Sequence, residues 1–78
     1  MRFNFKCLVA GEESEIQVDP VELPNQSNCY RINQNGRFCT YLCKINGEYR
    51  SPRDSNLDIK DMDAIGERIE EYLLRHSG

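Results

Sequence analysis

The stretch YRINQNGRFCTYLCKINGEYR, residues 30–50, contains the dipeptide Asn-Gly twice, at residues 35–36 and at residues 46–47. Asn-Gly between runs rich in aromatic and β-branched residues is the strongest short-range signal for a β-hairpin, because a type I′ turn needs positive φ at both central residues. The two turns therefore predict three consecutive antiparallel strands, over about residues 28–34, 37–45 and 48–51.

Two-residue loops also predict the register of these strands. The expected pairs are Gln34 with Arg37, Ile32 with Cys39, Tyr30 with Tyr41, Ile45 with Glu48 and Lys44 with Tyr49. Side chains alternate between faces along a strand, so the register decides which residues share a face. A G1 bulge would reverse the parity of Arg31 and Tyr49 relative to the central strand.

The residues before this stretch predict two further strands. Apolar and polar side chains alternate over residues 2–10, as expected for a half-buried strand. The alternation resumes in a second strand over about residues 14–23. Pro20 interrupts that strand, and because proline cannot donate to a ladder, we expect a bulge or a bend there.

The period changes near Asp58, which predicts a C-terminal helix over about residues 58–76. Apolar and aromatic residues now recur at steps of three and four, and they form the stripe Met62, Ile65, Ile69, Tyr72, Leu73 and His76. Gly66 lies inside this stripe, where it costs about 1 kcal/mol relative to alanine. We interpret it as a point of close approach to the sheet, over an aromatic ring; the alternative is a weak point in the helix.

These elements predict an α+β fold, in which an antiparallel β-meander of about five strands carries one C-terminal helix on one face. Seventy-eight residues leave no room for a second core, so we expect a single domain over residues 1–78. The apolar residues of the N-terminal segment are interspersed with Arg2, Asn4 and Lys6, unlike a signal peptide or a membrane helix. A cytoplasmic location is therefore the expectation.

The four cysteines predict neither a disulfide framework nor a zinc site. Cys39 and Cys43 lie four residues apart on a predicted strand, which separates their Cα atoms by about 13 Å. That distance is too long for a disulfide and poor for shared metal ligation. We expect small, mostly buried thiols in a reducing compartment, with a bridge from Cys7 to one of the other cysteines left open.

Four short motifs resemble the pattern of a group of small bacterial proteins of unknown function. They are Val18-Asp19-Pro20, Tyr30-Arg31-Ile32, Gly47-Glu48-Tyr49 and Ile65-Gly66-Glu67-Arg68-Ile69-Glu70, the last resembling the closing IGxxIE helix of that group. Tyr49 departs from the pattern, in which tryptophan is expected. The resemblance spans most of the chain and implies a β-meander with a C-terminal helix and no known activity.

No pattern typical of an active site occurs in the sequence. The single histidine, His76, lies at the end of the predicted helix, and there is no nucleophile elbow, phosphate loop or dinucleotide fingerprint. The acidic residues of the helix lack the spacing of a calcium loop and are better explained as a solvated face. We therefore expect a non-catalytic protein with no cofactor and no metal.

Charge is distributed unevenly along the chain, whose net charge is −3. Residues 25–53 contain five basic residues and one acidic residue, whereas the segments on both sides are acidic. The predicted register places Tyr30, Ile32, Cys39, Tyr41, Cys43 and Ile45 toward the helix. It places Cys29 and the candidate binding residues Arg31, Phe38, Thr40, Leu42, Lys44 and Tyr49 on the opposite face.

An exposed face that mixes arginine with tyrosine and phenylalanine has the composition of a protein interface. We therefore expect a small protein-interaction module whose partner is another protein or a second copy of the chain joined face to face. Single-stranded nucleic acid is the alternative, because bases stack on aromatic rings and cations neutralise phosphates. The sequence pI of about 5.0 disfavours that partner. No membrane is expected to take part.

Overall fold

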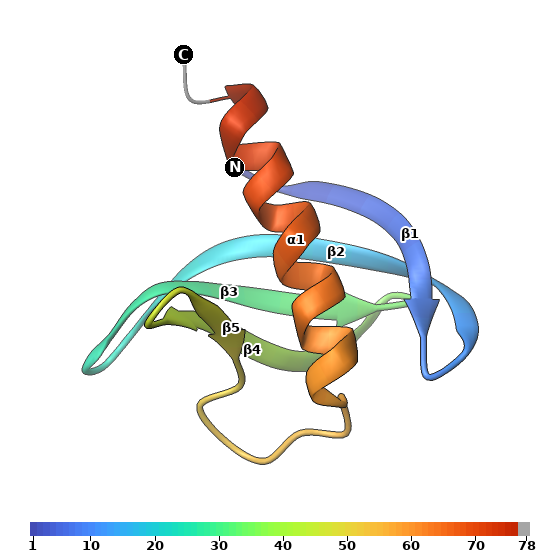
Figure 1. Cartoon of the computed structure of the whole chain (residues 1–78), viewed down its shortest axis with the longest axis horizontal. Helices are drawn as coiled ribbons and strands as arrows, with labels where there is room; N and C mark the ends of the chain where they lie inside the picture. Colours follow the sequence, from blue (N-terminus) through green and yellow to red (C-terminus); the bar gives the residue numbers. More distant parts are fainter. Residues whose placement is uncertain (77–78) are drawn as a thin grey trace.

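The computed structural model describes residues 1–76 and contains five strands followed by one helix (Figure 1). The strands are β1 (Phe3–Val9), β2 (Glu12–Leu23), β3 (Gln26–Gln34), β4 (Arg37–Ile45) and β5 (Glu48–Arg50), and the helix is α1 (Ile59–His76). All neighbours pair antiparallel, in the order β1-β2-β3-β4-β5. The predicted α+β fold, an antiparallel meander with a C-terminal helix, is confirmed.

Four tight turns join the five strands. Both predicted Asn-Gly turns have positive φ at their two central residues, with 51° at Asn35 and 53° at Asn46. Asn35 also fastens its turn to β2: its side-chain oxygen accepts a hydrogen bond from the Glu15 backbone at 2.9 Å, and its own N–H donates to the Glu15 carbonyl at 2.8 Å. The turns therefore form for the local reason that the sequence indicated.

The second strand is irregular near the proline. Pro20 pairs with Tyr30, and the register shift falls slightly later, between Val21 and Leu23. Pairing with β1 has already ended at Val18, so the missing N–H of Pro20 lies in a part of β2 that has a neighbour on one side only.

The register of β3 and β4 departs from the prediction by one residue. Gln34 pairs with Arg37 as predicted, but Ile32 pairs with Thr40 instead of Cys39, and Tyr30 pairs with Leu42 instead of Tyr41. Asn33 pairs with Phe38 and Ile32 pairs with Thr40, so Cys39 has no partner on β3 and is the extra residue of a β-bulge. From Thr40 onward, the side chains of β4 therefore point to the face opposite to the one predicted.

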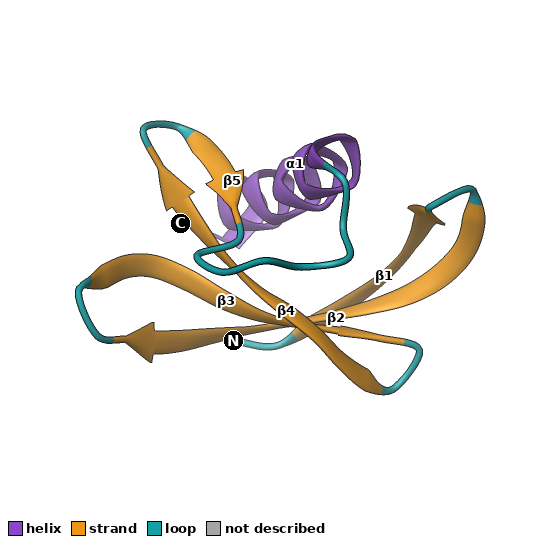
Figure 2. Ribbon diagram, turned by 90° about the horizontal axis from the view of Figure 1, so that it is seen from below, coloured by secondary structure: helices purple, strands orange, loops and turns teal. Residues whose placement is uncertain are grey.

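The helix lies across one face of the strongly twisted sheet (Figure 2). The bulge turns Leu42 and Thr40 toward this helix, and Tyr49 follows because it pairs across from Lys44 as predicted. The core is formed by Phe5, Val9, Ile16, Val18, Tyr30, Ile32, Leu42, Tyr49, Leu57, Met62, Ile65 and Ile69. The prediction that Leu42 and Tyr49 face away from the helix is thus wrong, because one inserted residue reverses the alternation.

Gly66 packs directly on the ring of Tyr49, which confirms the predicted close approach of the helix to an aromatic ring. A Cβ atom added at Gly66 would lie 2.5 Å from Tyr49 Cδ2 and 2.7 Å from Tyr49 Cγ. Real Cβ atoms do not approach other carbon atoms so closely. Tyr49 has little room to move away, because it pairs with Lys44 in the sheet and its side chain is only 5% exposed. The absent side chain therefore sets the distance between α1 and β5.

Substituting Gly66→Ala should destabilise the protein, although alanine is the better helix former. The helix gains about 1 kcal/mol from propensity, but the clash with Tyr49 forces repacking of the kind that costs about 1–3 kcal/mol. We expect a net loss of up to about 2 kcal/mol in the free energy of unfolding, measured by urea denaturation. Glu67→Ala on the exposed side is the control, and a Gly66→Ala protein more stable than wild type would contradict the packing.

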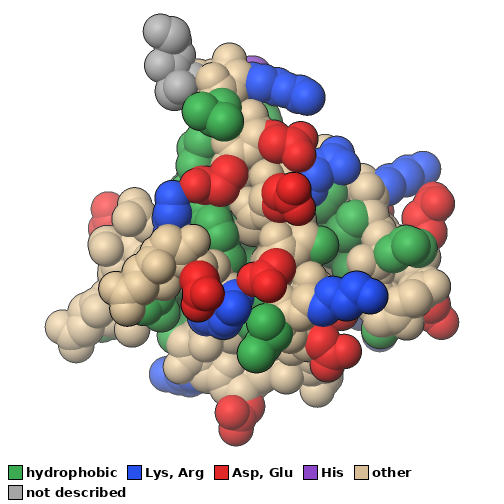
Figure 3. All heavy atoms as spheres, in the orientation of Figure 1, with side chains coloured by type: hydrophobic (Ala, Val, Ile, Leu, Met, Phe, Trp, Pro, Cys, Tyr) green, Lys and Arg blue, Asp and Glu red, His purple; other side chains and the backbone are tan. Residues whose placement is uncertain are grey.

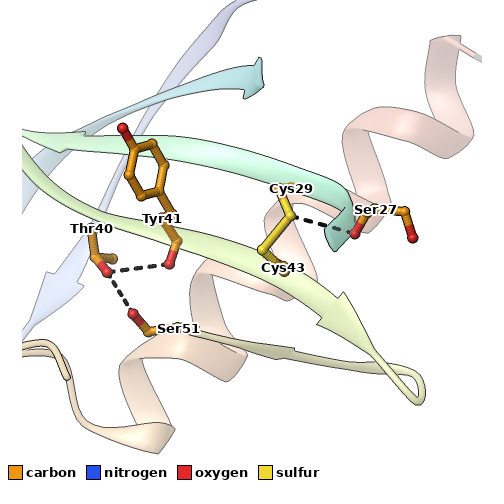
Figure 4. Close-up of a disulfide and its surroundings, with 6 residues drawn as sticks. All are labelled: Ser27, Cys29, Thr40, Tyr41, Cys43 and Ser51. Atoms are coloured by element: carbon orange, nitrogen blue, oxygen red, sulfur yellow. Dashed lines mark hydrogen bonds between the residues drawn. A yellow bond between two sulfur atoms is a disulfide. The ribbon is translucent and has the colours of Figure 1, made fainter. Parts of the chain in front are cut away.

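Cys29 and Cys43 form a disulfide between β3 and β4 (Figure 4). Their Cα atoms lie 4.1 Å apart in directly opposite positions, and the side chains are almost fully buried. The expectation of four reduced thiols is wrong for this pair. Without the bulge, Cys29 would stand opposite Leu42, so the inserted residue is what brings the two sulfur atoms together. Cys7 and Cys39 are free and half-buried, and burial raises the pKa of both thiols.

Removing the disulfide should lower stability without changing the fold. The bond closes a loop with a sequence separation of 14 residues, for which the chain-entropy model gives about 3 kcal/mol. Wild-type protein treated with a reductant should therefore unfold at a markedly lower urea concentration, and the Cys29→Ala/Cys43→Ala variant should no longer respond to the reductant. A wild-type protein that is equally stable with and without reductant would contradict a structural role for this bond.

Candidate functional site

The structure separates the six candidate binding residues into two groups. We call the side of the sheet turned away from α1 the outer face. Arg31 and Phe38 lie exposed on the outer face as predicted. Thr40, Leu42 and Tyr49 are buried, with exposures of 5%, 0% and 5%, and half-buried Lys44 reaches the helix. The predicted grouping of all six on one exposed face is therefore wrong.

Lys44 and Tyr49 converge on one carboxylate of the helix. The Lys44 ammonium group donates to Glu70 Oε1 at 2.6 Å, and the Tyr49 hydroxyl donates to Glu70 Oε2 at 2.8 Å. Next to them the Arg50 guanidinium donates to Asp63 Oδ1 at 2.7 Å. Two of the five cations in the basic stretch thus pair with carboxylates of α1.

These contacts explain much of the uneven charge of the chain. On the face that carries α1, acidic and basic side chains lie intermingled (Figure 3). The cations of the β4–β5 hairpin meet the acidic helix across the Gly66–Tyr49 contact. Much of the positive charge that suggested a binding face therefore docks the helix.

The contacts among Lys44, Tyr49 and Glu70 also shift pKa values. The Lys44 ammonium group, followed by the Tyr49 hydroxyl, holds the pKa of Glu70 below its ordinary value. Burial, with the Glu70 carboxylate adding to it, raises the pKa of Tyr49 well above its ordinary value. Glu70 therefore stays ionised and Tyr49 stays protonated throughout the neutral range.

The lowered pKa of Glu70 predicts a pH-dependent contribution to stability. Because the folded pKa lies below the ordinary value of 4.5, the contribution is fully present above about pH 4.5 and is lost as the pH falls through the folded pKa. Glu70→Gln should therefore be less stable than wild type at pH 7, and the difference should shrink in more acidic solution. Urea unfolding at a series of pH values measures this.

Glu71→Gln is the matched control, because Glu71 is exposed on the neighbouring helix position. Its effect should be small and should not follow the same pH dependence. A Glu70→Gln effect that is constant from pH 3 to pH 7 would contradict the lowered pKa.

Three residues form a cluster on the outer face, which we call the outer cluster: Arg31, Phe38 and Tyr41. The Arg31 guanidinium lies over the Phe38 ring, 5.4 Å from its centre. The rings of Phe38 and Tyr41 are 5.1 Å apart and inclined at 60°. Phe38 is nevertheless 51% exposed. Tyr41 was predicted to face the helix, and the sequence contains no signal for the position of the bulge that turns it outward.

A groove of about 630 Å³ runs beside this cluster. It is lined by Leu23, Pro24 and Gln26 from the β2–β3 turn, by Phe38, Cys39, Thr40 and Tyr41 of β4, and by Ser51, Pro52, Arg53 and Asp54 after β5. We call it the β4 groove. The hydroxyls of Thr40 and Ser51 share a hydrogen bond of 2.7 Å that ties the two walls together, and the Thr40 hydroxyl also donates to the Tyr41 carbonyl at 3.2 Å (Figure 4).

The β4 groove presents aromatic, hydroxyl, thiol and charged groups. Burial raises the pKa of Cys39, which keeps this thiol protonated and weakly nucleophilic. Its lining residues include no histidine. Arg53 at the rim makes no ion pair with any residue that the structure describes.

Two searches of the described residues give negative results. No group of three or more His, Cys, Asp or Glu side chains within residues 1–76 could hold a metal ion. Over the same residues, no helix combines the length and the apolar character needed to cross a membrane. Comparison with protein-family models, curated proteins and solved structures finds no match to the chain.

Proposed function

We propose that this protein is a small, non-catalytic protein-interaction module that binds a partner protein through the outer cluster and the β4 groove. The observation that carries the proposal is Phe38, a half-exposed aromatic ring held between Arg31 and Tyr41 at the edge of a groove. Arginine and tyrosine are enriched among the residues that dominate binding energy at interfaces. Fixed rings also lose little conformational entropy when a partner docks.

The proposed partner is a protein other than a second copy of the chain. A face-to-face homodimer needs about 800 Å² of contact on each copy. Leu42 and Tyr49, which would have supplied apolar anchors for it, are buried in the core. Phe38 is then the main exposed anchor of the outer cluster, and one ring beside a groove fits a narrow partner segment better than a flat surface.

The charges also favour a protein over single-stranded nucleic acid. Nucleic acid binding depends on cations that are free to neutralise phosphates. Lys44 and Arg50 pair with Glu70 and Asp63 instead, and the whole chain is acidic, with a pI of about 5.0. Of the five cations in residues 25–53, three remain for a polyanion, Arg31, Arg37 and Arg53, in a chain that is acidic as a whole.

The proposed function requires no cofactor. The sequence predicts a cytoplasmic location, but the Cys29–Cys43 disulfide argues against it, because such bonds persist mainly in oxidising compartments. Trapping free thiols with an alkylating reagent in intact cells checks the location: reduced cysteines agree with the cytoplasm, and an oxidised pair contradicts it.

The outer cluster predicts the effect of removing one ring. A partner captured by affinity purification and identified by mass spectrometry should bind the Phe38→Ala protein at least about thirtyfold more weakly than wild type. That ratio corresponds to the 2 kcal/mol or more that defines an interface hot spot. Isothermal titration calorimetry with the purified partner measures it.

Leu8→Ala is the matched control, because Leu8 is a 64% exposed apolar residue on β1, away from the outer cluster. It should leave the affinity nearly unchanged. Equal binding by wild type and Phe38→Ala would overturn the proposed site. A mass of twice 9.1 kDa in sedimentation, abolished by Phe38→Asp, would overturn the choice of partner and assign a second copy instead.

A further inference from the structure

We propose that the β4 groove receives an extended segment of the partner protein, which pairs as an additional strand with the open edge of β4. This inference rests on the proposed function and deepens it, because it specifies the conformation of the partner. It is carried by the backbone of β4, which is independent of the side chains of the outer cluster.

The edge of β4 is open over most of its length. β5 pairs with Cys43, Lys44 and Ile45 only. Within residues 1–76, no strand pairs with β4 from Arg37 to Leu42 on the side away from β3. The β4 groove lies along this open part, since four consecutive residues of β4, Phe38–Tyr41, line it.

The alternation of the ladder shows which backbone groups face the groove. In a hairpin closed by a two-residue turn, the pair next to the turn is hydrogen-bonded, and bonded and non-bonded pairs then alternate. Ile45 and Glu48 flank the turn and form a hydrogen-bonded pair, so Cys43 and Arg50 form the next one. Two residues further along β4, the backbone N–H and carbonyl of Tyr41 point to the same side as those of Cys43. The Tyr41 carbonyl accepts a hydrogen bond from the Thr40 hydroxyl. The Tyr41 N–H is therefore the backbone group left to donate to a new strand.

Pro52 explains why β5 does not occupy this edge itself. If the register of Cys43 with Arg50 continued, Pro52 would stand opposite Tyr41. Proline has no N–H to give to the ladder and is excluded from such a position. The chain therefore leaves the sheet after Arg50, and Ser51–Asp54 become the far wall of the groove instead of a strand.

The other open edge of the sheet is less suited to a partner strand. β1 is seven residues long, and the hollow beside Phe3–Phe5 has a volume of about 290 Å³, less than half that of the β4 groove. Exposed Lys6 stands in the middle of β1. A charged lysine on an edge strand is a common device that discourages pairing with another chain. The open part of β4 carries a charge only at its first residue, exposed Arg37, and none from Phe38 to Leu42, where the groove lies.

The walls of the groove specify the chemistry of the segment. An added strand would direct alternate side chains to the outer face, where an apolar one would meet Phe38 and Tyr41. Arg53 lacks an ion pair within residues 1–76, and it lines the opposite wall. We therefore infer an extended segment with an apolar residue and, near it, a carboxylate that pairs with Arg53.

A phage-displayed library of random peptides, selected on the immobilised full chain, provides the probe. Selected peptides should carry an acidic residue and an apolar residue, and their affinity should fall for both Phe38→Ala and Arg53→Glu. Methylating the peptide amides one at a time should weaken binding about tenfold or more at alternate positions, because each such position loses a backbone hydrogen bond. In the ¹⁵N-labelled protein, the bound peptide should slow hydrogen exchange at the Tyr41 amide.

The outcomes separate this inference from the proposed function. One outcome is peptide binding that depends on Phe38 but tolerates methylation at every amide, as the binding of proline-rich peptides would. That result would overturn strand addition and leave the proposed interaction surface intact. Peptides whose binding is indifferent to both Phe38 and Arg53 would contradict the site as well. Leu8→Ala serves again as the control that should bind the peptides like wild type.

Discussion

The inserted residue Cys39 in β4 is the constraint on which the rest of this structure depends. Phe38 and Tyr41 are three residues apart, so in a regular strand they would lie on opposite faces of the sheet. The bulge places both on the outer face, with their rings 5.1 Å apart. The same insertion turns Leu42 into the core and brings Cys43 opposite Cys29. One extra residue thus produces the outer cluster, completes the core beneath the helix and aligns the disulfide.

The uneven charge of the sequence serves in part to hold the helix on the sheet. A basic hairpin between two acidic segments suggests a surface for an external anion. In the structure, however, Lys44 and Arg50 meet Glu70 and Asp63 of α1. These contacts surround Gly66, where the helix approaches Tyr49 most closely. The ion pairs are partly exposed, so each contributes modestly to stability, but together they define how the acidic helix lies on the hairpin. Three cations of the basic stretch do not pair with the helix: Arg31 lies over the Phe38 ring, Arg37 begins β4, and Arg53 lines the groove.

The proposed binding surface follows from places where regular pairing stops. Pro52 ends β5 early, which exposes the edge of β4, and the following loop becomes a wall tied back by the Thr40–Ser51 hydrogen bond. The buried Cys29–Cys43 bond lies next to Arg31 and Tyr41 on the paired strands, so it holds the two strands of the outer cluster together. A groove with rigid walls and an unused backbone edge suits recognition of an extended chain.

The sequence by itself determined the elements whose causes are local. The Asn-Gly turns, the alternation in the first strands, the helical stripe and the place of Gly66 in it could all be predicted, because each depends on residues close together in the chain. The candidate site could be predicted only in part: Arg31 and Phe38 precede the bulge and are exposed as expected, whereas Thr40, Leu42, Lys44 and Tyr49 are not. Tertiary structure decided the rest. A bulge at Cys39 is favoured only when Leu42 can pack beneath the helix and Cys43 can reach Cys29, and these contacts join residues that are far apart in the sequence.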